Sequence, residues 1–257
     1  MLNEISEEQF KQGATIVSGI LESMLSITPE TLDYTLELIG ISDNELKSVK
    51  ILHAEKQYAH SVYFLQQAIE KSTKSFGLSL GIIKLDQLKG KDGINHKSPK
   101  VFLEMIKTTT WGAEVTKMME QQSNKPDISK VENIINDEDK QIEIAKADKN
   151  TIELLFKVVD DLDKNLQIEK SETNNDELDM FEFSKGNCFL YLISCYSWVH
   201  FIYTRYPEEK MKPKDYTEEL GIVSETPKIV SRIEKINSDL RKYVLMMKGN
   251  DEIKESD

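Results

Sequence analysis

The sequence predicts an all-α protein, and two patterns carry this prediction. Apolar residues recur at steps of three, four and seven over long stretches, and capping residues or a proline mark where several of these stretches begin. Strict alternation of apolar and polar residues, which is typical of half-buried strands, is nearly absent. At 257 residues the chain can bury a full hydrophobic core, so disulfides and metals are not required for folding.

Accessory helices are predicted over residues 1–50. Ser6 and Gln9 form a capping box that opens the first helix. Thr28 followed by Pro29 is an N-cap with a first-turn proline, and Gly40 is expected to end this second, short helix.

The main bundle is expected over residues 51–248. A second capping box, Ser42 with Glu45, opens a helical pattern that reaches about Ile83. Apolar residues form one stripe along this pattern: Tyr58, Val62, Leu65, Ile69 and Phe76. Ser98 and Pro99 begin the next major helix. Because a single stripe is apolar, this long segment is expected to pack against a partner helix.

The second half of the chain alternates polar and apolar segments. Residues from about 124 to 180 are acidic and rich in asparagine, and we interpret them as a partly ordered insertion. One amphipathic helix is expected within it: Ile152, Leu155, Val159, Leu162 and Leu166. An apolar helix then runs from Asn187 to Arg205, a last helix begins at Thr226, and residues 249–257 form a tail.

Charge is distributed unevenly. The net charge is −12, and residues 127–182 hold 17 acidic and 7 basic residues, a net of −10. Residues 84–107 hold six lysines against three acidic residues. This segment is either a basic patch for nucleic acid or a solvated lysine-rich surface.

The N-terminus, the cysteines and two of the histidines bear on cellular location and metal binding. The N-terminus lacks the basic start and apolar run of a secretory signal, and Ser194 and His200 interrupt the apolar helix, so we expect a cytoplasmic protein with no membrane span. Cys188 and Cys195 are seven residues apart and are interpreted as buried thiols. His53 and His60 share a helix face without an evident third ligand. We therefore expect no metal and no cofactor.

Three segments follow one another in a helical context: AEKQYAHSVYFLQQAIEKSTKSFGLSLGII at 54–83, NHKSPKVF at 95–102 and TRYP at 204–207. Together they resemble a divergent archaeal or bacterial HEPN domain, a family named for nucleotide binding in higher eukaryotes and prokaryotes. The resemblance implies an up-and-down bundle of four or five helices, here with an N-terminal helical extension and the acidic insertion between its third and fourth members. It also implies a homodimer and a role in RNA cleavage, antiviral defence or a toxin–antitoxin pair, often with a nucleotidyltransferase-type partner protein.

Catalytic HEPN proteins carry an arginine, four to six residues, then a histidine, and cut RNA without a metal. This motif is absent, because the only arginines are Arg205, Arg232 and Arg241 and the last histidine is His200. The reversed pair His200 and Arg205 could supply an imidazole for proton transfer and a cation for the phosphate. The alternative is that His200 is a hydrogen-bonded core residue and Arg205 caps its helix.

Candidate binding residues for RNA or a nucleotide lie in the first two matched segments. His96, Lys97 and Lys100 stand at a loop-to-helix junction, where free N–H groups and cations attract phosphate, or where His96 caps the loop. Glu70 and Lys74 match the family helix, in which they would line a groove, although exposed ion pairing explains them equally.

Three functions follow as hypotheses. The first is a HEPN-like protein that binds RNA, a nucleotide or a partner protein without the standard ribonuclease motif. The second is a divergent metal-independent endoribonuclease that acts as a toxin. The third is a helical adaptor whose acidic insertion recruits a basic partner. The sequence leaves enzymatic activity open.

Overall fold

The computed structural model describes residues 27–88, 94–108, 137–161, 180–208 and 210–254. All regular structure in these ranges is helical, which confirms the all-α prediction. The α-helices are α2 (Pro29–Ala54), α3 (Tyr58–Ser79), α4 (Pro99–Thr108), α7 (Glu138–Ala145), α8 (Lys149–Asp160), α10 (Met180–Ser197), α11 (His200–Tyr203), α12 (Gly221–Ser224) and α13 (Thr226–Lys254). Short 3-10 helices occupy Leu85–Leu88 and Pro213–Asp215.

The first described helix, α2, begins as predicted and ends elsewhere. Thr28 Oγ1 accepts a hydrogen bond from the Thr31 N–H at 3.2 Å, and Pro29 occupies the first turn. The expected end at Gly40 is wrong, because α2 continues to Ala54. Buried side chains continue on both sides of this glycine, and their burial outweighs the roughly 1 kcal/mol that glycine costs a helix.

The predicted capping box of Ser42 and Glu45 is also wrong, because both residues lie inside α2. Ser42 is buried, and its hydroxyl donates to the Ala68 carbonyl of α3 at 3.0 Å. The chain turns instead at residues 55–57, where Lys56 has a left-handed φ of 57°. The long pattern up to residue 83 is therefore two helices, and they pack against each other along their lengths.

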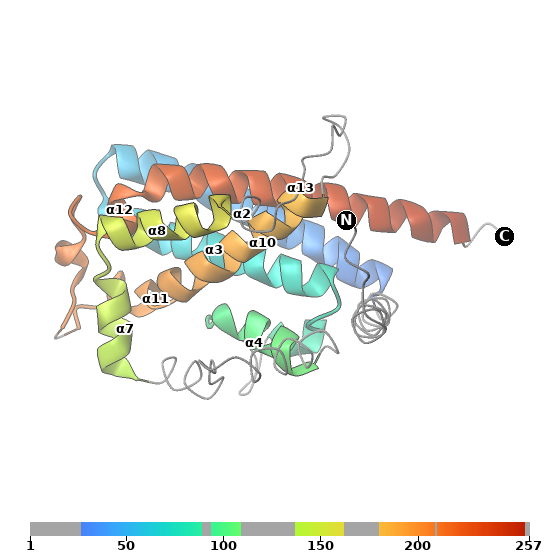
Figure 1. The fold of residues 1–257 in the computed structure, drawn as a ribbon, viewed down its shortest axis with the longest axis horizontal. Helices are drawn as coiled ribbons and strands as arrows, with labels where there is room; N and C mark the ends of the chain where they lie inside the picture. Colours follow the sequence, from blue (N-terminus) through green and yellow to red (C-terminus); the bar gives the residue numbers. More distant parts are fainter. Residues whose placement is uncertain (1–26, 89–93, 109–136, 162–179, 209, 255–257) are drawn as a thin grey trace, which may run out of the picture.

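The centre of the bundle is α3, which contacts α2, α13, α10, α11 and α4 (Figure 1). Sixteen of its 22 residues are buried, including polar ones. The largest fully buried side chains of the core include Phe189 of α10, Leu46 of α2 and Leu65 of α3. The boundary predicted at residue 50 falls inside α2, whose side chains belong to this same core.

Part of the predicted insertion is helical and packs on the bundle. Part of the amphipathic helix expected there is α8, which buries Ile152, Leu155 and Val159 against α10 and α12. Leu162 and Leu166 of that prediction lie outside the described residues. Gly221 begins α12, and its N–H donates to the Ala147 carbonyl at 3.0 Å. A Cβ at this glycine would lie 2.3 Å from the Asp148 carbonyl oxygen, so the close approach of α8 and α12 requires glycine.

Several further predictions are decided by this fold. The starts of α4 at Pro99 and of α13 at Thr226 are confirmed. The last helix runs past residue 249 to Lys254. Cys188 is exposed rather than buried, so the prediction for this thiol is wrong. Within the described ranges, no helix combines the length and apolar character that crossing a membrane demands. The helix predicted at Ser6 lies outside the described residues.

Candidate functional site

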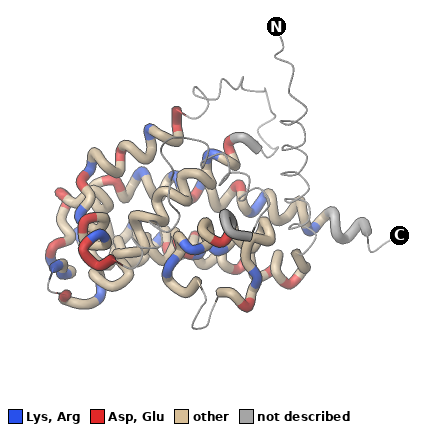
Figure 2. Tube along the Cα trace, turned by 60° about the horizontal axis from the view of Figure 1, so that its bottom comes forward, with Lys and Arg blue, Asp and Glu red and all other residues tan. Residues whose placement is uncertain are grey.

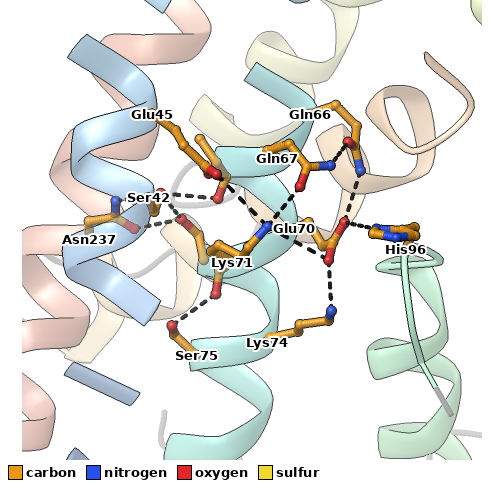
Figure 3. A network of polar contacts seen from close by, with 12 residues as sticks. Ser42, Glu45, Gln66, Gln67, Glu70, Lys71, Lys74, Ser75, His96 and Asn237 are labelled. Carbon is orange, nitrogen blue, oxygen red and sulfur yellow. Dashed lines mark hydrogen bonds and ion pairs between the residues drawn. The ribbon is translucent and has the colours of Figure 1, made fainter. Parts of the chain in front are cut away.

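Seven polar residues form a continuous network between the inside of the bundle and its surface (Figure 3). We call it the Glu70 network. It contains Glu45 of α2, Gln66, Gln67, Glu70, Lys71 and Lys74 of α3, and His96 from the segment before α4. The helical repeat brings residues three and four apart onto one face of α3, and this face carries most of the network.

Glu70 is the centre of the network and is only 1% exposed. Its Oε1 accepts from Lys74 Nζ at 2.7 Å, and its Oε2 accepts from Gln66 Nε2 at 3.2 Å. Burial opposes ionisation, but Lys74 and Lys71 together hold the pKa of Glu70 below its usual value. Glu70 is therefore ionised at neutral pH, and its two oxygens accept hydrogen bonds from the Lys74 ammonium and the Gln66 amide.

A row of side-chain amides links the centre of the network to α2. Gln67 Nε2 donates to Gln66 Oε1 at 2.5 Å, and Lys71 Nζ donates to Gln67 Oε1 at 2.9 Å. Lys71 Nζ also lies 3.9 Å from Glu70 Oε1 and 3.9 Å from Glu45 Oε1. The Lys71 ammonium thus stands between two carboxylates from neighbouring helices.

The outer end of the network is His96. Its Nδ1 lies 3.1 Å from Glu70 Oε2. Because an ionised carboxylate only accepts hydrogen bonds, Nδ1 must be the protonated donor, which leaves Nε2 for another partner. The His96 ring stacks on Phe201 with centroids 4.0 Å apart and an angle of 16°, while its side chain stays 51% exposed. His96 is therefore an oriented imidazole at the surface.

Arg205 also contacts the Phe201 ring. Its guanidinium carbon is 5.4 Å from the centroid of Phe201, 5.5 Å from that of Tyr63 and 5.4 Å from that of Tyr206. We call Tyr63, His96, Phe201, Arg205 and Tyr206 the His96–Arg205 surface. On this surface the His96 imidazole and the exposed Arg205 guanidinium both lie against the Phe201 ring.

The other predicted histidine, His200, lies in the core. It is 1% exposed, and its Nδ1 is 2.8 Å from the hydroxyl of Tyr216. Burial lowers the pKa of His200 to about 3, so its imidazole is neutral at physiological pH. His200 therefore agrees with the interpretation as a hydrogen-bonded core residue, and not with the one as a surface imidazole for proton transfer.

The predicted lysines have different surroundings. Lys74 is 8% exposed and its charge is paired with Glu70, so it holds the carboxylate in place. Lys97 and Lys100 are half-buried beside the start of α4. Figure 2 shows Lys and Arg interspersed with Asp and Glu along the described helices. Part of the predicted lysine-rich segment lies outside those residues.

His53 and His60, which were expected on one helix face, lie on different helices: His53 is in the last turn of α2 and His60 is in the first turn of α3. His53 Nε2 lies 3.1 Å from the Val223 carbonyl oxygen, and its ring meets the Tyr58 ring edge-on at 5.4 Å. His60 is exposed. In the part of the chain that the structure describes, no three His, Cys, Asp or Glu residues are grouped so that they could hold a metal ion.

Seven members of the Glu70 network and the His96–Arg205 surface were not among the predicted site residues: Glu45, Tyr63, Gln66, Gln67, Lys71, Phe201 and Tyr206. Phe201 lies in the predicted apolar helix and Tyr63 lies beside the apolar stripe of the long pattern, and no spacing marks either ring as part of a binding surface. Glu45 was interpreted as part of a helix cap. Their roles follow from the packing of α2, α3, α4 and α11, which are brought together only in three dimensions.

Comparison with known proteins adds no relative. No protein-family model, no curated protein and no solved structure matches this chain.

Proposed function

We propose that this chain is a HEPN-like protein that binds RNA or a nucleotide at the His96–Arg205 surface and lacks the standard ribonuclease motif. One observation carries the proposal: the imidazole of His96 is held by the buried carboxylate of Glu70 and shares the ring of Phe201 with the guanidinium of Arg205. Two residues that the sequence marked as separate candidates thus meet on one surface. The likeness of three segments to HEPN domains supports the same conclusion.

The chemistry of this surface suits a nucleotide. An arginine fork binds phosphate oxygens, and aromatic rings stack on bases without regard to their identity. Tyr206 is 52% exposed beside Arg205, which leaves one ring accessible to a base. Because acidic and basic residues are interspersed on the described helices, general electrostatic attraction is weak and the affinity depends on these local groups.

Binding is tested by fluorescence polarisation with a labelled single-stranded RNA and with a labelled nucleotide. Arg205→Ala and His96→Ala should each weaken binding by about tenfold, because each removes a contact worth 1–3 kcal/mol. Arg232→Ala is the matched control, since Arg232 of α13 also lies over aromatic rings but pairs with Asp160 of α8 and contacts Phe156 and Phe189 instead of Phe201. Equal affinities of the wild type, Arg205→Ala and His96→Ala would contradict the proposal.

A second candidate is a metal-independent endoribonuclease. The pairing of a carboxylate with an imidazole at Glu70 and His96 favours it, because such a pair orients the ring for proton transfer, and Arg205 could stabilise the charged phosphorane. The test is cleavage of total RNA in EDTA. Loss of cleavage in both His96→Ala and Arg205→Ala, with retention in His200→Gln, would support the enzyme, and no cleavage by the wild type would count against it.

The homodimer and a nucleotidyltransferase-type partner remain part of the proposal that the resemblance suggests. Size-exclusion chromatography with light scattering tests the dimer directly. A molar mass near 29.6 kDa at all protein concentrations would contradict it.

A further inference from the structure

Glu45 is a carboxyl group that binding at the surface does not use. Its side chain is 17% exposed, and Lys71 Nζ is 3.9 Å from Oε1, beyond hydrogen-bond distance. Oε2 is buried and makes no hydrogen bond to any residue that the structure describes. A buried, unpaired carboxylate oxygen costs free energy, so this position favours the protonated acid.

The charged groups around Glu45 come mainly from one helix. α3 presents Lys71, which favours the ionised form, and Glu70, which opposes it. α13 also packs on α2, but its Arg241 pairs with Asp43 at 2.6 Å and its Glu234 with Lys50 at 2.6 Å. Burial is the largest effect and raises the pKa of Glu45 to about 7.

An unbroken set of contacts leads from Glu45 to the surface (Figure 3). Lys71 Nζ is 3.9 Å from Glu45 Oε1 and equally 3.9 Å from Glu70 Oε1. The other oxygen of Glu70 holds His96 Nδ1 at 3.1 Å. The Lys71 ammonium is therefore shared between the buried acid and the carboxylate that orients the imidazole.

We propose that Glu45 stores a proton inside the folded protein and that release of this proton changes the charge state of His96 through Lys71 and Glu70. When Glu45 ionises, it attracts Lys71, and Glu70 is then neutralised less by that cation. The less neutralised Glu70 favours a positively charged His96 ring. The effect of this switch on RNA or nucleotide binding rests on the proposed function, whereas the link between the two groups does not.

Carbon-13 NMR of the full chain between pH 5 and 9 tests the proposal without any nucleic acid. A Glu carboxyl signal should change with a midpoint near pH 7 and be missing from Glu45→Gln. The His96 ring signal should respond to that same transition, and this response should be missing from Glu45→Gln. Signals are assigned with Glu45→Gln and His96→Ala.

Two further variants sharpen this experiment. Glu37→Gln is the matched control, because Glu37 is an exposed glutamate on the same helix, and it should leave the His96 signal unchanged. Lys71→Met should move the Glu45 transition to higher pH and at least halve the response of His96.

Two results would overturn the proposal: no carboxyl transition between pH 6 and 8, or a His96 signal that is identical in the wild type and Glu45→Gln. Because no RNA is present, a failure of RNA binding would leave this outcome unaffected.

Discussion

At the scale of single residues, the functional candidates depend on an ionised carboxylate inside a helical bundle. Glu70 is tolerated there because Lys74, Gln66 and His96 supply donors to its two oxygens. A buried ion pair is costly to break, since the remaining partner is left charged without compensation. The contact that supplies a donor to Glu70 Oε2 also orients the His96 ring, so the stability of Glu70 and the position of His96 are linked.

Glu70→Gln should destabilise the protein by about 3 kcal/mol, because Lys74 stays buried without its counter-ion. Urea unfolding measures the change. The double variant with Glu70→Gln and Lys74→Met should lose less stability than Glu70→Gln alone, since both charges are removed. Glu234→Gln, at an exposed pair with Lys50, should cost under about 1 kcal/mol. A loss in Glu70→Gln as small as in Glu234→Gln would contradict the prediction.

Glu45 predicts how stability depends on pH. Its pKa is about 7 in the folded protein against 4.5 ordinarily, so between these values the folded state holds a proton that the unfolded chain has lost. Stability should therefore fall as pH rises from about 4.5 to about 7, by at most about 3 kcal/mol. Glu45→Gln should be more stable than the wild type at pH 8. Urea unfolding of the wild type and of Glu45→Gln at pH 5, 6.5 and 8 measures this. A difference in unfolding free energy between the two proteins that is the same at all three pH values would contradict the prediction.

At the scale of elements, glycine plays different roles in two helices: it is dispensable for packing in α2 and required for packing in α12. Gly40 lies within α2, and a Cβ there would meet no atom within 4 Å. Gly221 begins α12, where a Cβ would overlap the backbone of residues 147 and 148. The sequence suggested a structural role for Gly40 only, whereas contacts between helices show that Gly221 is the glycine that is required.

Gly40→Ala should therefore raise the free energy of unfolding by about 0.5–1 kcal/mol, since alanine favours the helix and reduces the freedom of the unfolded chain. Gly221→Ala should lower it by about 1–3 kcal/mol, because α12 must move away from α8. Thermal unfolding of the two variants measures both changes. A stabilised Gly221→Ala would show that α12 does not pack closely against α8.

At the scale of the whole molecule, α2 is joined to the bundle by a polar layer as well as by apolar packing. Ser72 Oγ donates to Asn237 Oδ1 at 2.6 Å, and Asn237 Nδ2 donates to Asp43 Oδ1 at 2.8 Å. These groups come from α3, α13 and α2 and are separated widely along the chain. Removal of α2 would leave the other two helices with unpaired polar groups and an exposed apolar face.

A fragment of residues 51–257 should therefore fail to fold cooperatively. α2 buries several large apolar side chains in the common core, namely Leu32, Leu38, Ile39, Leu46 and Val49. Far-UV circular dichroism during urea titration should show a shallow, non-sigmoidal change for the fragment and a single transition for the full chain. A fragment with the same midpoint as the full chain would identify residues 1–50 as an accessory unit after all.

Local sequence patterns were sufficient for the class of the fold and for the starts of several helices. Thr28 with Pro29 decides where α2 begins, because capping is an interaction within one turn. The apolar stripe of α3 did not predict its buried face, because polar residues on the rest of this helix are buried as well. His96, Glu70, Lys74 and Arg205 could be selected as candidates because their residue types carry charge or titrate near neutrality. The apolar surroundings of His200 allowed its burial to be proposed as one of two alternatives, but the meeting of His96 with Glu70 and Phe201 could not be inferred from spacing.

The sequence by itself determined that this chain is helical, where α4 and α13 begin, and that the arginine-to-histidine ribonuclease motif is missing. Only the tertiary structure decided that α2 passes through Gly40, that His200 is a core residue, and that His96 and Arg205 share the ring of Phe201. The reason is physical: helix starts depend on neighbours within a few residues, whereas burial, pKa values and the meeting of distant side chains depend on how whole helices pack.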